Sequence, residues 1–91
     1  MALFDLLGRR DCLAVLWALR DGPVTFRGLQ TAAGGVAAAT LSSRTKELRK
    51  AKLIELTDDG YVLTEIGRDL LEVGLPLENW AITWAQSLDD E

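Results

Sequence analysis

Residues 35–54 constrain the fold of this chain more than any other segment, because they read in succession as a glycine turn, an amphipathic helix and an apolar strand. Successive helical residues are rotated by about 100°, so Thr45, Leu48 and Lys52 return to within about 40° of Leu41. We therefore expect Leu41 and Leu48 to anchor the buried side of this helix.

The opposite side of the same helix is narrow and basic. Small residues come first and cations later, an order that suits a DNA major groove, because small side chains allow close approach to base edges and cations reach phosphates. A lone run of charges is more often an ordinary solvated face, so the neighbouring segments decide between the two interpretations. The residues on this side are Ala39, Ser43, Lys46 and Lys50, flanked by Ser42 and Arg49.

The neighbouring segments favour a DNA-binding helix. Upstream, residues 25–33 predict a helix with Thr25 as its N-cap, and Gly34-Gly35 then turn the chain, which is the helix-turn-helix arrangement. Downstream, two short strands flank Asp59-Gly60, a pair that favours a type I′ hairpin with positive φ at both central residues. A hairpin directly after a recognition helix is a wing. The expected fold is α+β and mostly α, a winged helix-turn-helix with a short two-stranded wing and a C-terminal dimerisation helix.

The C-terminal segment predicts helix with an interruption. Thr64 is the expected cap of a helix, which Gly74 and Pro76 then either kink or break. The following helix, from residue 77 to about 88, carries a stripe that packs either on its own domain or on a second copy. We favour the second copy, because the core of a small domain is thin and aromatic residues are enriched in interfaces. The stripe consists of Leu77, Trp80, Ala81, Trp84 and Leu88.

The first core helix carries a second tryptophan-containing surface. Leu13, Leu16 and Leu19 follow helical spacing, and Trp17 lies about 40° outside their arc. We therefore expect Trp17 either to be partly exposed or to take part in an interface.

Length and composition limit what the chain does. Its 91 residues predict a single domain, divided into the helix-turn-helix at 25–52, the wing at 53–64 and C-terminal helices at 65–88. With no histidine and one cysteine, the usual catalytic triads, multi-thiol metal sites and internal disulfides are not expected, so we predict no enzyme, no metal and no cofactor. No apolar run spans a bilayer and no signal peptide opens the chain, which predicts a cytoplasmic protein without a membrane partner.

Charge is divided unevenly along the chain. Residues 1–52 hold nine basic and four acidic residues, whereas residues 53–91 hold one basic and ten acidic residues, which makes the net charge −4. Nucleic acids respond to local potential within about 8–10 Å, so the positive half can act despite this total. Arg44 is expected either to brace Glu47 or to contact DNA. The expected DNA-binding residues are Thr25, Arg27, Ala38, Ala39, Ser42, Ser43, Lys46, Arg49 and Lys50.

Segments spread over residues 6–84 resemble the HxlR-type winged helix-turn-helix transcriptional regulators of bacteria. The most telling are Asp-Gly-Pro-x-x-Phe at 21–26 and Leu-Thr-Glu-x-Gly-Arg at 63–68. The resemblance implies a cytoplasmic homodimer, paired through its terminal helices, that binds a double-stranded DNA operator as a repressor or activator. It also implies that relatives often sense electrophiles or oxidants through a cysteine ahead of the first helix.

Several positions depart from that family pattern. Ala37 replaces the usual serine N-cap of the recognition helix, and Asp58-Asp59 occupy a wing that usually carries an arginine. Cys12 lies inside the first core helix, so we predict a small buried residue and not a sensor. The acidic wing and the missing cap favour an alternative function, a winged-helix module that has lost DNA binding and acts through protein–protein interaction.

Overall fold

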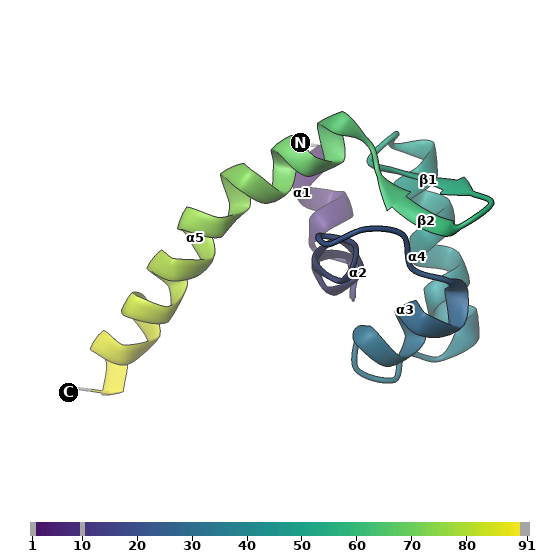
Figure 1. The fold of residues 1–91 in the computed structure, drawn as a ribbon. Helices are drawn as coiled ribbons and strands as arrows, with labels where there is room; N and C mark the ends of the chain where they lie inside the picture. Colours follow the sequence, from purple (N-terminus) through teal and green to yellow (C-terminus); the bar gives the residue numbers. More distant parts are fainter. Residues whose placement is uncertain (1, 10, 90–91) are drawn as a thin grey trace.

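The computed structural model describes residues 2–9 and 11–89. Figure 1 shows a body built from short helices, a hairpin against one side of it, and a long helix that runs out from it. This arrangement confirms the expected mostly helical winged helix-turn-helix. The elements are α1 (Ala2–Leu7), α2 (Cys12–Ala18), α3 (Phe26–Ala32), α4 (Ala38–Lys50), β1 (Ile54–Thr57), β2 (Gly60–Leu63) and α5 (Glu65–Asp89).

A single apolar core joins the body to the hairpin. As the helical pattern predicts, Leu41 and Leu48 of α4 are fully buried, and Thr45 between them is also buried. α2 lies at the centre of this core, because it contacts α1, α3, α4 and α5. The other buried hydrophobic residues are Cys12, Val15, Leu16, Leu19, Leu29, Val36, Leu53, Ile54 and Leu63.

The turn between α3 and α4 depends on two glycines in the left-handed region, Gly34 at φ 92° and Gly35 at φ 80°. The amide of Gly35 donates to the carbonyl oxygen of Gln30 at 2.7 Å, and the Gln30 side chain donates to the carbonyl oxygen of Val36 at 3.1 Å. These bonds set the direction in which α4 begins. As the sequence predicts, Ala37 at the N-cap of α4 supplies no side-chain hydrogen bond.

Thr25 is the N-cap of α3, as predicted, and its hydroxyl accepts the amide of Gly28 at 3.1 Å. A Cβ atom at Gly28 would lie 2.9 Å from a Val24 methyl carbon. The glycine inside this helix therefore allows α3 to lie against Val24.

The hairpin turn differs from the prediction. Residue 57 pairs with residue 60, so Asp58 and Asp59 form the loop, and of these residues only Gly60 has a positive φ, at 121°. The expected type I′ turn is wrong, because Gly60 is needed for a close approach instead. Val24 forms two backbone hydrogen bonds with Tyr61, at 3.0 and 2.8 Å, and a Cβ atom at Gly60 would lie 2.6 Å from the Val24 carbonyl oxygen. The Thr57 hydroxyl stabilises the loop by accepting the Asp59 amide at 3.2 Å.

The C-terminal segment is one continuous helix with Pro76 inside it, so of the two alternatives expected at Gly74 and Pro76, a kink or a break, the break is wrong. Proline removes one intrahelical hydrogen bond and crowds the preceding turn, which bends a helix without ending it when long flanking turns continue on both sides. The helix begins as predicted at Thr64, whose hydroxyl accepts the Gly67 amide at 3.0 Å and donates to the Lys52 carbonyl oxygen at 2.6 Å. A Cβ atom at Gly67 would clash with the Leu53 carbonyl oxygen, so this glycine lets α5 start directly against the body.

One residue of α2 was wrongly placed by its spacing. Leu16 and Leu19 are buried, but Leu13 is 55% exposed, because Cys12 and Val15 complete the buried side of the helix in its place. Trp17 is 42% exposed, as predicted. No helix in the described residues combines the length and the apolar character needed to cross a membrane.

Candidate nucleic-acid interface

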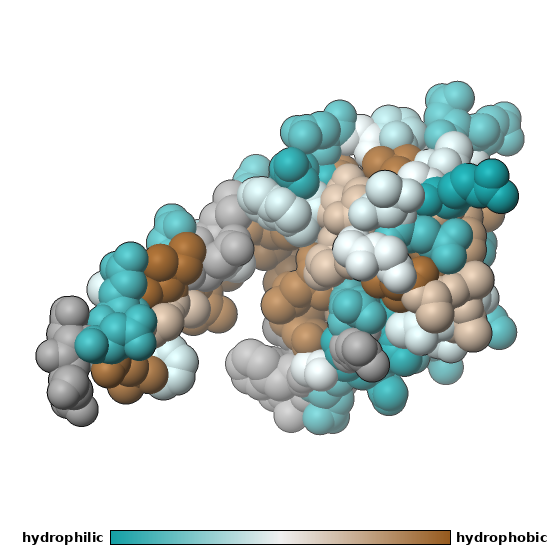
Figure 2. Space-filling model, turned by 90° about the horizontal axis from the view of Figure 1, so that it is seen from below, coloured by the Kyte–Doolittle hydropathy of each residue, from teal (hydrophilic) through white to brown (hydrophobic). Residues whose placement is uncertain are grey.

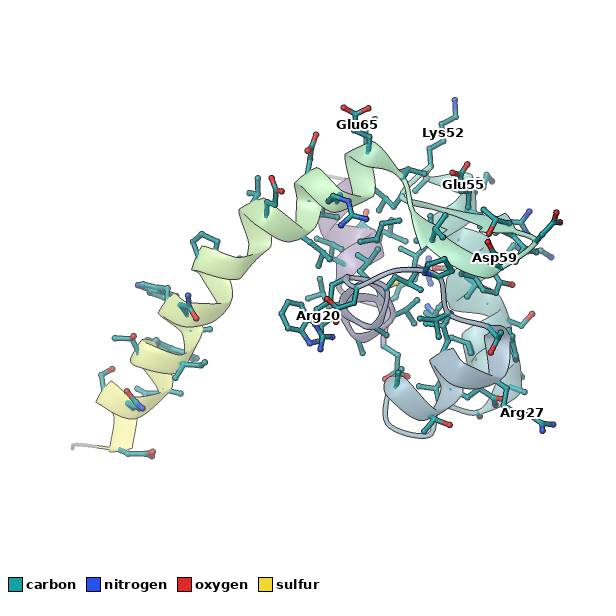
Figure 3. All side chains as sticks on the ribbon, viewed as in Figure 1. Arg20, Arg27, Lys52, Glu55, Asp59 and Glu65 are labelled. Carbon is teal, nitrogen blue, oxygen red and sulfur yellow. The ribbon has the colours of Figure 1, made fainter. Side chains whose placement is uncertain are left out.

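All nine residues predicted to contact DNA are exposed. Seven lie on α4, and the other two, Thr25 and Arg27, lie at the start of α3. Figure 3 shows Arg27 at the end of the body opposite Lys52, which follows the last turn of α4. Cations are therefore available at both ends of the exposed side of α4, where the two phosphate strands bordering a major groove would lie.

A hollow of about 590 Å³ lies between the second half of α4 and strand β1. Four cationic side chains line it against one carboxylate, that of Glu55, so its local charge is positive although the whole chain is acidic. The hollow continues the exposed side of α4 toward the wing. Its lining residues are Lys46, Arg49, Lys50, Lys52, Ile54, Glu55, Leu56 and Thr64.

Lys52 also lines this hollow, although the helical pattern did not predict that its side chain is exposed there. Periodicity places Lys52 on the buried side with Leu41, but α4 ends at Lys50, with Ala51 as its C-cap. Lys52 then adopts a φ of 63° and is exposed. The helix rotation no longer applies beyond the cap, and the left-handed backbone turns the side chain outward. A short interval between the last helical leucine and the strand was the only sequence signal of this ending.

Arg44 braces Glu47, which resolves the two roles expected for it. Its Nη1 lies 3.5 Å from both carboxylate oxygens of Glu47, and the Arg9 Nε lies 3.1 Å from one of the same oxygens. The Arg44 side chain is only 16% exposed. These ion pairs tie α4 to the chain preceding α2, and they leave the outward side of α4 to the other cations.

The wing carries the opposite charge. Asp58 and Asp59 are exposed in the hairpin loop, and Figure 3 shows Glu55 and Asp59 on the hairpin beside α4. A carboxylate near a phosphate is repelled, so the charge of the wing is unfavourable for contact with nucleic acid, whereas the charge on the exposed side of α4 is favourable.

Cys12 is fully buried, which confirms that part of the prediction. Burial raises the pKa of the Cys12 thiol above its ordinary value, and this effect outweighs the nearby Arg44 guanidinium, which lowers the pKa. A thiol that stays protonated is a poor nucleophile. Among the described residues, no group of three or more His, Cys, Asp and Glu side chains is arranged to hold a metal ion.

The tryptophan stripe of α5, formed by Leu77, Trp80, Ala81, Trp84 and Leu88, is not covered by the body. Its large side chains are between 52% and 65% exposed, so packing on its own domain, one of the two interpretations, is wrong. The Trp80 and Trp84 rings stack on each other with centroids 6.3 Å apart and an interplanar angle of 7°. In Figure 1 this half of α5 projects away from the other elements.

Comparison with known proteins identifies the family. The family model described as HxlR-like helix-turn-helix matches residues 6–89. The chain belongs to the HxlR-like helix-turn-helix family. It is therefore a helix-turn-helix transcriptional regulator and not an enzyme, as the sequence predicts.

Individual relatives of this HxlR-like regulator agree in fold and length. An uncharacterized HTH-type transcriptional regulator of Methanocaldococcus jannaschii, MJ0925, is 28% identical over 96% of this chain and 86% of its own length. The quinone-bound YodB protein of B. subtilis superposes with a TM-score of 0.84 and 30% identity, over 90% of this chain and 93% of YodB. A possible HxlR family transcriptional factor of Thermoplasma volcanium has a TM-score of 0.80 over 100% of this chain and 84% of its own, and its 24% identity supports the fold alone.

Proposed function

We propose that this regulator binds a double-stranded DNA operator as a homodimer and reads its sequence through α4. The observation that carries the proposal is the exposed side of α4, with small residues first, cations later, and further cations beyond both ends. A helix of 13 residues spans about 20 Å, enough to follow a major groove across several base pairs.

Within this proposal the exposed residues divide between bases and phosphates. Ser42, Ser43 and Lys46 face base edges, and Ala38 and Ala39 contact thymine methyl groups. The remaining residues contact phosphates and set the position of the protein on the duplex. They are Thr25, Arg27, Arg49 and Lys50, and we include Lys52 because its exposed side chain lines the same basic hollow. The Thr25 hydroxyl accepts the Gly28 amide, so it keeps its own proton for a phosphate oxygen.

The homodimer forms through α5 in this proposal. Its tryptophan stripe is the exposed apolar surface that a second copy would cover, and a two-fold axis would present two α4 helices to successive major grooves, about 34–36 Å apart. Residues 1–91 act as one domain, and the protein works in the cytoplasm without a cofactor.

A second function is favoured by a specific observation, the exposed pair Asp58 and Asp59 in the wing. Together with the uncapped start of α4 at Ala37, this acidic loop fits a winged-helix module that has lost DNA binding and acts through protein–protein interaction. The two functions differ in whether α4 selects a DNA sequence.

Selection from a randomised duplex pool separates the two functions. We expect the parent protein to enrich a roughly palindromic sequence at low salt, with affinity that falls as salt rises. The variant Lys46→Glu should abolish the enrichment, whereas the control Glu72→Lys, a charge change on α5, should retain it. Enrichment of no sequence by the parent protein, with binding unaffected by Lys46→Glu, would replace the DNA-binding proposal with the protein-interaction module.

A further inference from the structure

The basic hollow between the second half of α4 and strand β1 is lined by more than cations. Ile54 and Leu56 also line it, and the Leu56 side chain is 51% exposed. An apolar surface therefore lies beside four cationic side chains in a hollow of about 590 Å³. This volume falls within the range of about 300–1,000 Å³ that small-molecule sites occupy. The hollow thus has the size and the two kinds of surface that a small amphipathic anion needs.

The apolar part of this hollow lies apart from the surface that the proposed homodimer covers. Figure 2 shows hydrophobic residues gathered on the projecting half of α5 and on the flank of the body beside it. The hairpin that carries Leu56 lies on the other side of the body from this half of α5 (Figure 1). A second copy bound through the tryptophan stripe therefore leaves the basic hollow open.

The cations of the hollow also differ from the arginines of the body, which have ionic partners. Arg9 and Arg44 share the carboxylate of Glu47. Among residues 2–9 and 11–89, no ion pair or side-chain hydrogen bond involves any of the four cationic side chains of the hollow. The negative end of the helix accounts for cations in the last turn of α4, but Lys52 lies beyond that turn. The charge of the hollow is therefore available to an anionic ligand.

Lys52 is held in place by its backbone. Its amide donates to the Arg49 carbonyl oxygen at 3.0 Å, and its carbonyl oxygen accepts the Thr64 hydroxyl at 2.6 Å. These two bonds fix the left-handed backbone, with φ 63°, that turns the side chain outward. Figure 3 shows Lys52 extending away from the body at the same end as Glu55. Since the backbone is already ordered, an anion that binds Lys52 does not have to order it.

The Glu55 carboxylate restricts the kind of anion that fits. It would repel a continuous run of phosphates along β1, whereas a compact anion can bind on the α4 side of the hollow and turn its apolar part toward Leu56. Four cations and one carboxylate give the lining a formal charge of +3, which suits a group with two negative charges. A phosphate monoester carries a charge of about −1.5 to −2 at neutral pH, and it accepts strong hydrogen bonds from Arg and Lys.

We propose that the basic hollow binds a small organic phosphate, with its phosphate group among the four cations and its apolar group against Leu56. This ligand occupies cations that the proposed operator complex also uses, so it competes with DNA and releases the protein from its operator. The site itself does not depend on DNA binding, whereas the competition rests on the proposed function.

Equilibrium dialysis at low salt tests the site with 1-naphthyl phosphate and inorganic phosphate as probes. The two share a phosphate group, and only the first has an apolar group. We expect 1-naphthyl phosphate to bind at least about tenfold more tightly, because its rings remove apolar surface of Leu56 from water. Equal binding of the two would indicate an adventitious ion only and would overturn the proposal. A third probe, 1-naphthoate, has a single charge and should bind more weakly than 1-naphthyl phosphate, so equal affinities would rule out phosphate as the ligand class.

Substitutions locate the site. Leu56→Ala should remove the advantage of 1-naphthyl phosphate and leave the affinity for inorganic phosphate unchanged, whereas Lys52→Gln should weaken both probes several-fold. Both side chains are exposed, so neither change removes a core residue. Leu13→Ala, at an exposed leucine on α2, and Arg68→Ala, at an exposed arginine on α5, are the matched controls and should change neither affinity. Losses as large in the controls would place the binding elsewhere.

Competition with DNA is measured by fluorescence anisotropy on the duplex that the parent protein selects. 1-Naphthyl phosphate at ten times its dissociation constant should raise the apparent dissociation constant of the duplex about tenfold. Inorganic phosphate at the same concentration and ionic strength should have little effect. A bound ligand that leaves the duplex in place would overturn the competition. A parent protein that selects no duplex but binds 1-naphthyl phosphate through Leu56 and Lys52 would contradict the proposed function and leave the site intact, so the two failures are distinguishable.

Discussion

At the scale of single residues, some glycines occupy positions where a side chain would collide with the backbone, and others do not. Gly60 combines a φ of 121° with a hypothetical Cβ contact of 2.6 Å to the Val24 carbonyl oxygen. Gly74, in contrast, lies inside α5, where a Cβ atom would meet nothing within 4 Å. The two positions therefore predict opposite consequences of the same substitution.

We expect Gly60→Ala to lower the free energy of unfolding by about 1–3 kcal/mol, because the backbone there is unfavourable for an L side chain and the methyl group displaces Val24. Gly74→Ala is the matched control, and it should raise the free energy of unfolding by about 0.5–1 kcal/mol through higher helix propensity. Urea denaturation of the three proteins measures both changes. Equal effects of the two substitutions would contradict the close approach of β2 to Val24.

Because Cys12 is buried, we expect the stability of the parent protein and of Cys12→Ala to respond differently to alkaline pH. The raised pKa means that the folded state keeps its proton after the unfolded thiol has ionised. Stability from this group is therefore complete below the ordinary thiol pKa, about 8.5, and is lost as pH rises from there through the folded pKa. We expect the parent protein to lose more stability than Cys12→Ala across that window, as followed by urea denaturation at several pH values. Rapid labelling of native Cys12 by a thiol reagent would contradict its burial.

At the scale of elements, the exposed side of α4 is positively charged and the hairpin loop is negatively charged. In the proposed complex this difference determines which element would contact DNA. α4 offers Lys46, Arg49 and Lys50, and Lys52 follows it, whereas the hairpin loop offers Asp58 and Asp59. Contact would then concentrate on the major groove, with little help from the wing.

Single substitutions in α4 distinguish residues that contact phosphates from residues that recognise the base sequence. Lys50→Ala should weaken binding to all sequences alike and flatten the dependence of log affinity on log salt by about 0.9, as expected for one lost phosphate contact. Ser43→Ala should instead change which sequence is preferred. Fluorescence anisotropy over a salt series measures both, with Arg68→Ala as a control that removes one charge from α5. A sequence-dependent effect of Lys50→Ala would reassign that residue to base readout.

Reversing the charge of the wing should improve binding. Asp58→Lys combined with Asp59→Lys removes two repulsions and adds two attractions, so affinity at low salt should rise and the salt dependence should steepen by up to about 1.8. Asp69→Lys combined with Glu72→Lys makes the same change in net charge on α5, far from α4. If both pairs tighten binding equally in the anisotropy measurement, total charge and not the wing is responsible.

The elements were predictable from the sequence wherever a local pattern determined them. Leu41 and Leu48 identified the buried side of α4, and the caps Thr25 and Thr64 marked two helix starts. The predictions failed where the outcome did not follow from local residue patterns. Gly60 serves the close approach to the Val24 backbone and not a type I′ turn. α5 continues through Pro76, and Lys52 turns outward because its helix has already ended. The DNA-contacting roles of the α4 residues remain predictions, although all of these residues are exposed.

At the scale of the whole molecule, a single copy leaves the large apolar side chains of the tryptophan stripe exposed. The extents of the chain are 50 × 26 × 25 Å, and much of the length comes from the projecting half of α5. Large apolar side chains exposed together on such a projection mark an interaction surface. Their burial by a second copy would also fix the distance between two α4 helices, so dimer formation and operator reading would be coupled.

Truncating the tryptophan stripe tests that coupling. Trp80→Ala combined with Trp84→Ala should convert the dimer into monomers, because each lost aromatic anchor typically costs about 2–4 kcal/mol, or roughly 30- to 1,000-fold in the dissociation constant. Ile82→Ala is the matched control, since this residue is equally exposed on α5 but lies well around the helix from the stripe. Sedimentation equilibrium measures assembly, and anisotropy on a one-half-site and a two-half-site duplex measures binding. The double variant should bind both duplexes with similar weak affinity, whereas the parent protein should prefer two half-sites strongly. A double variant that remains dimeric would contradict assembly through the stripe, and a monomeric parent protein would contradict the homodimer.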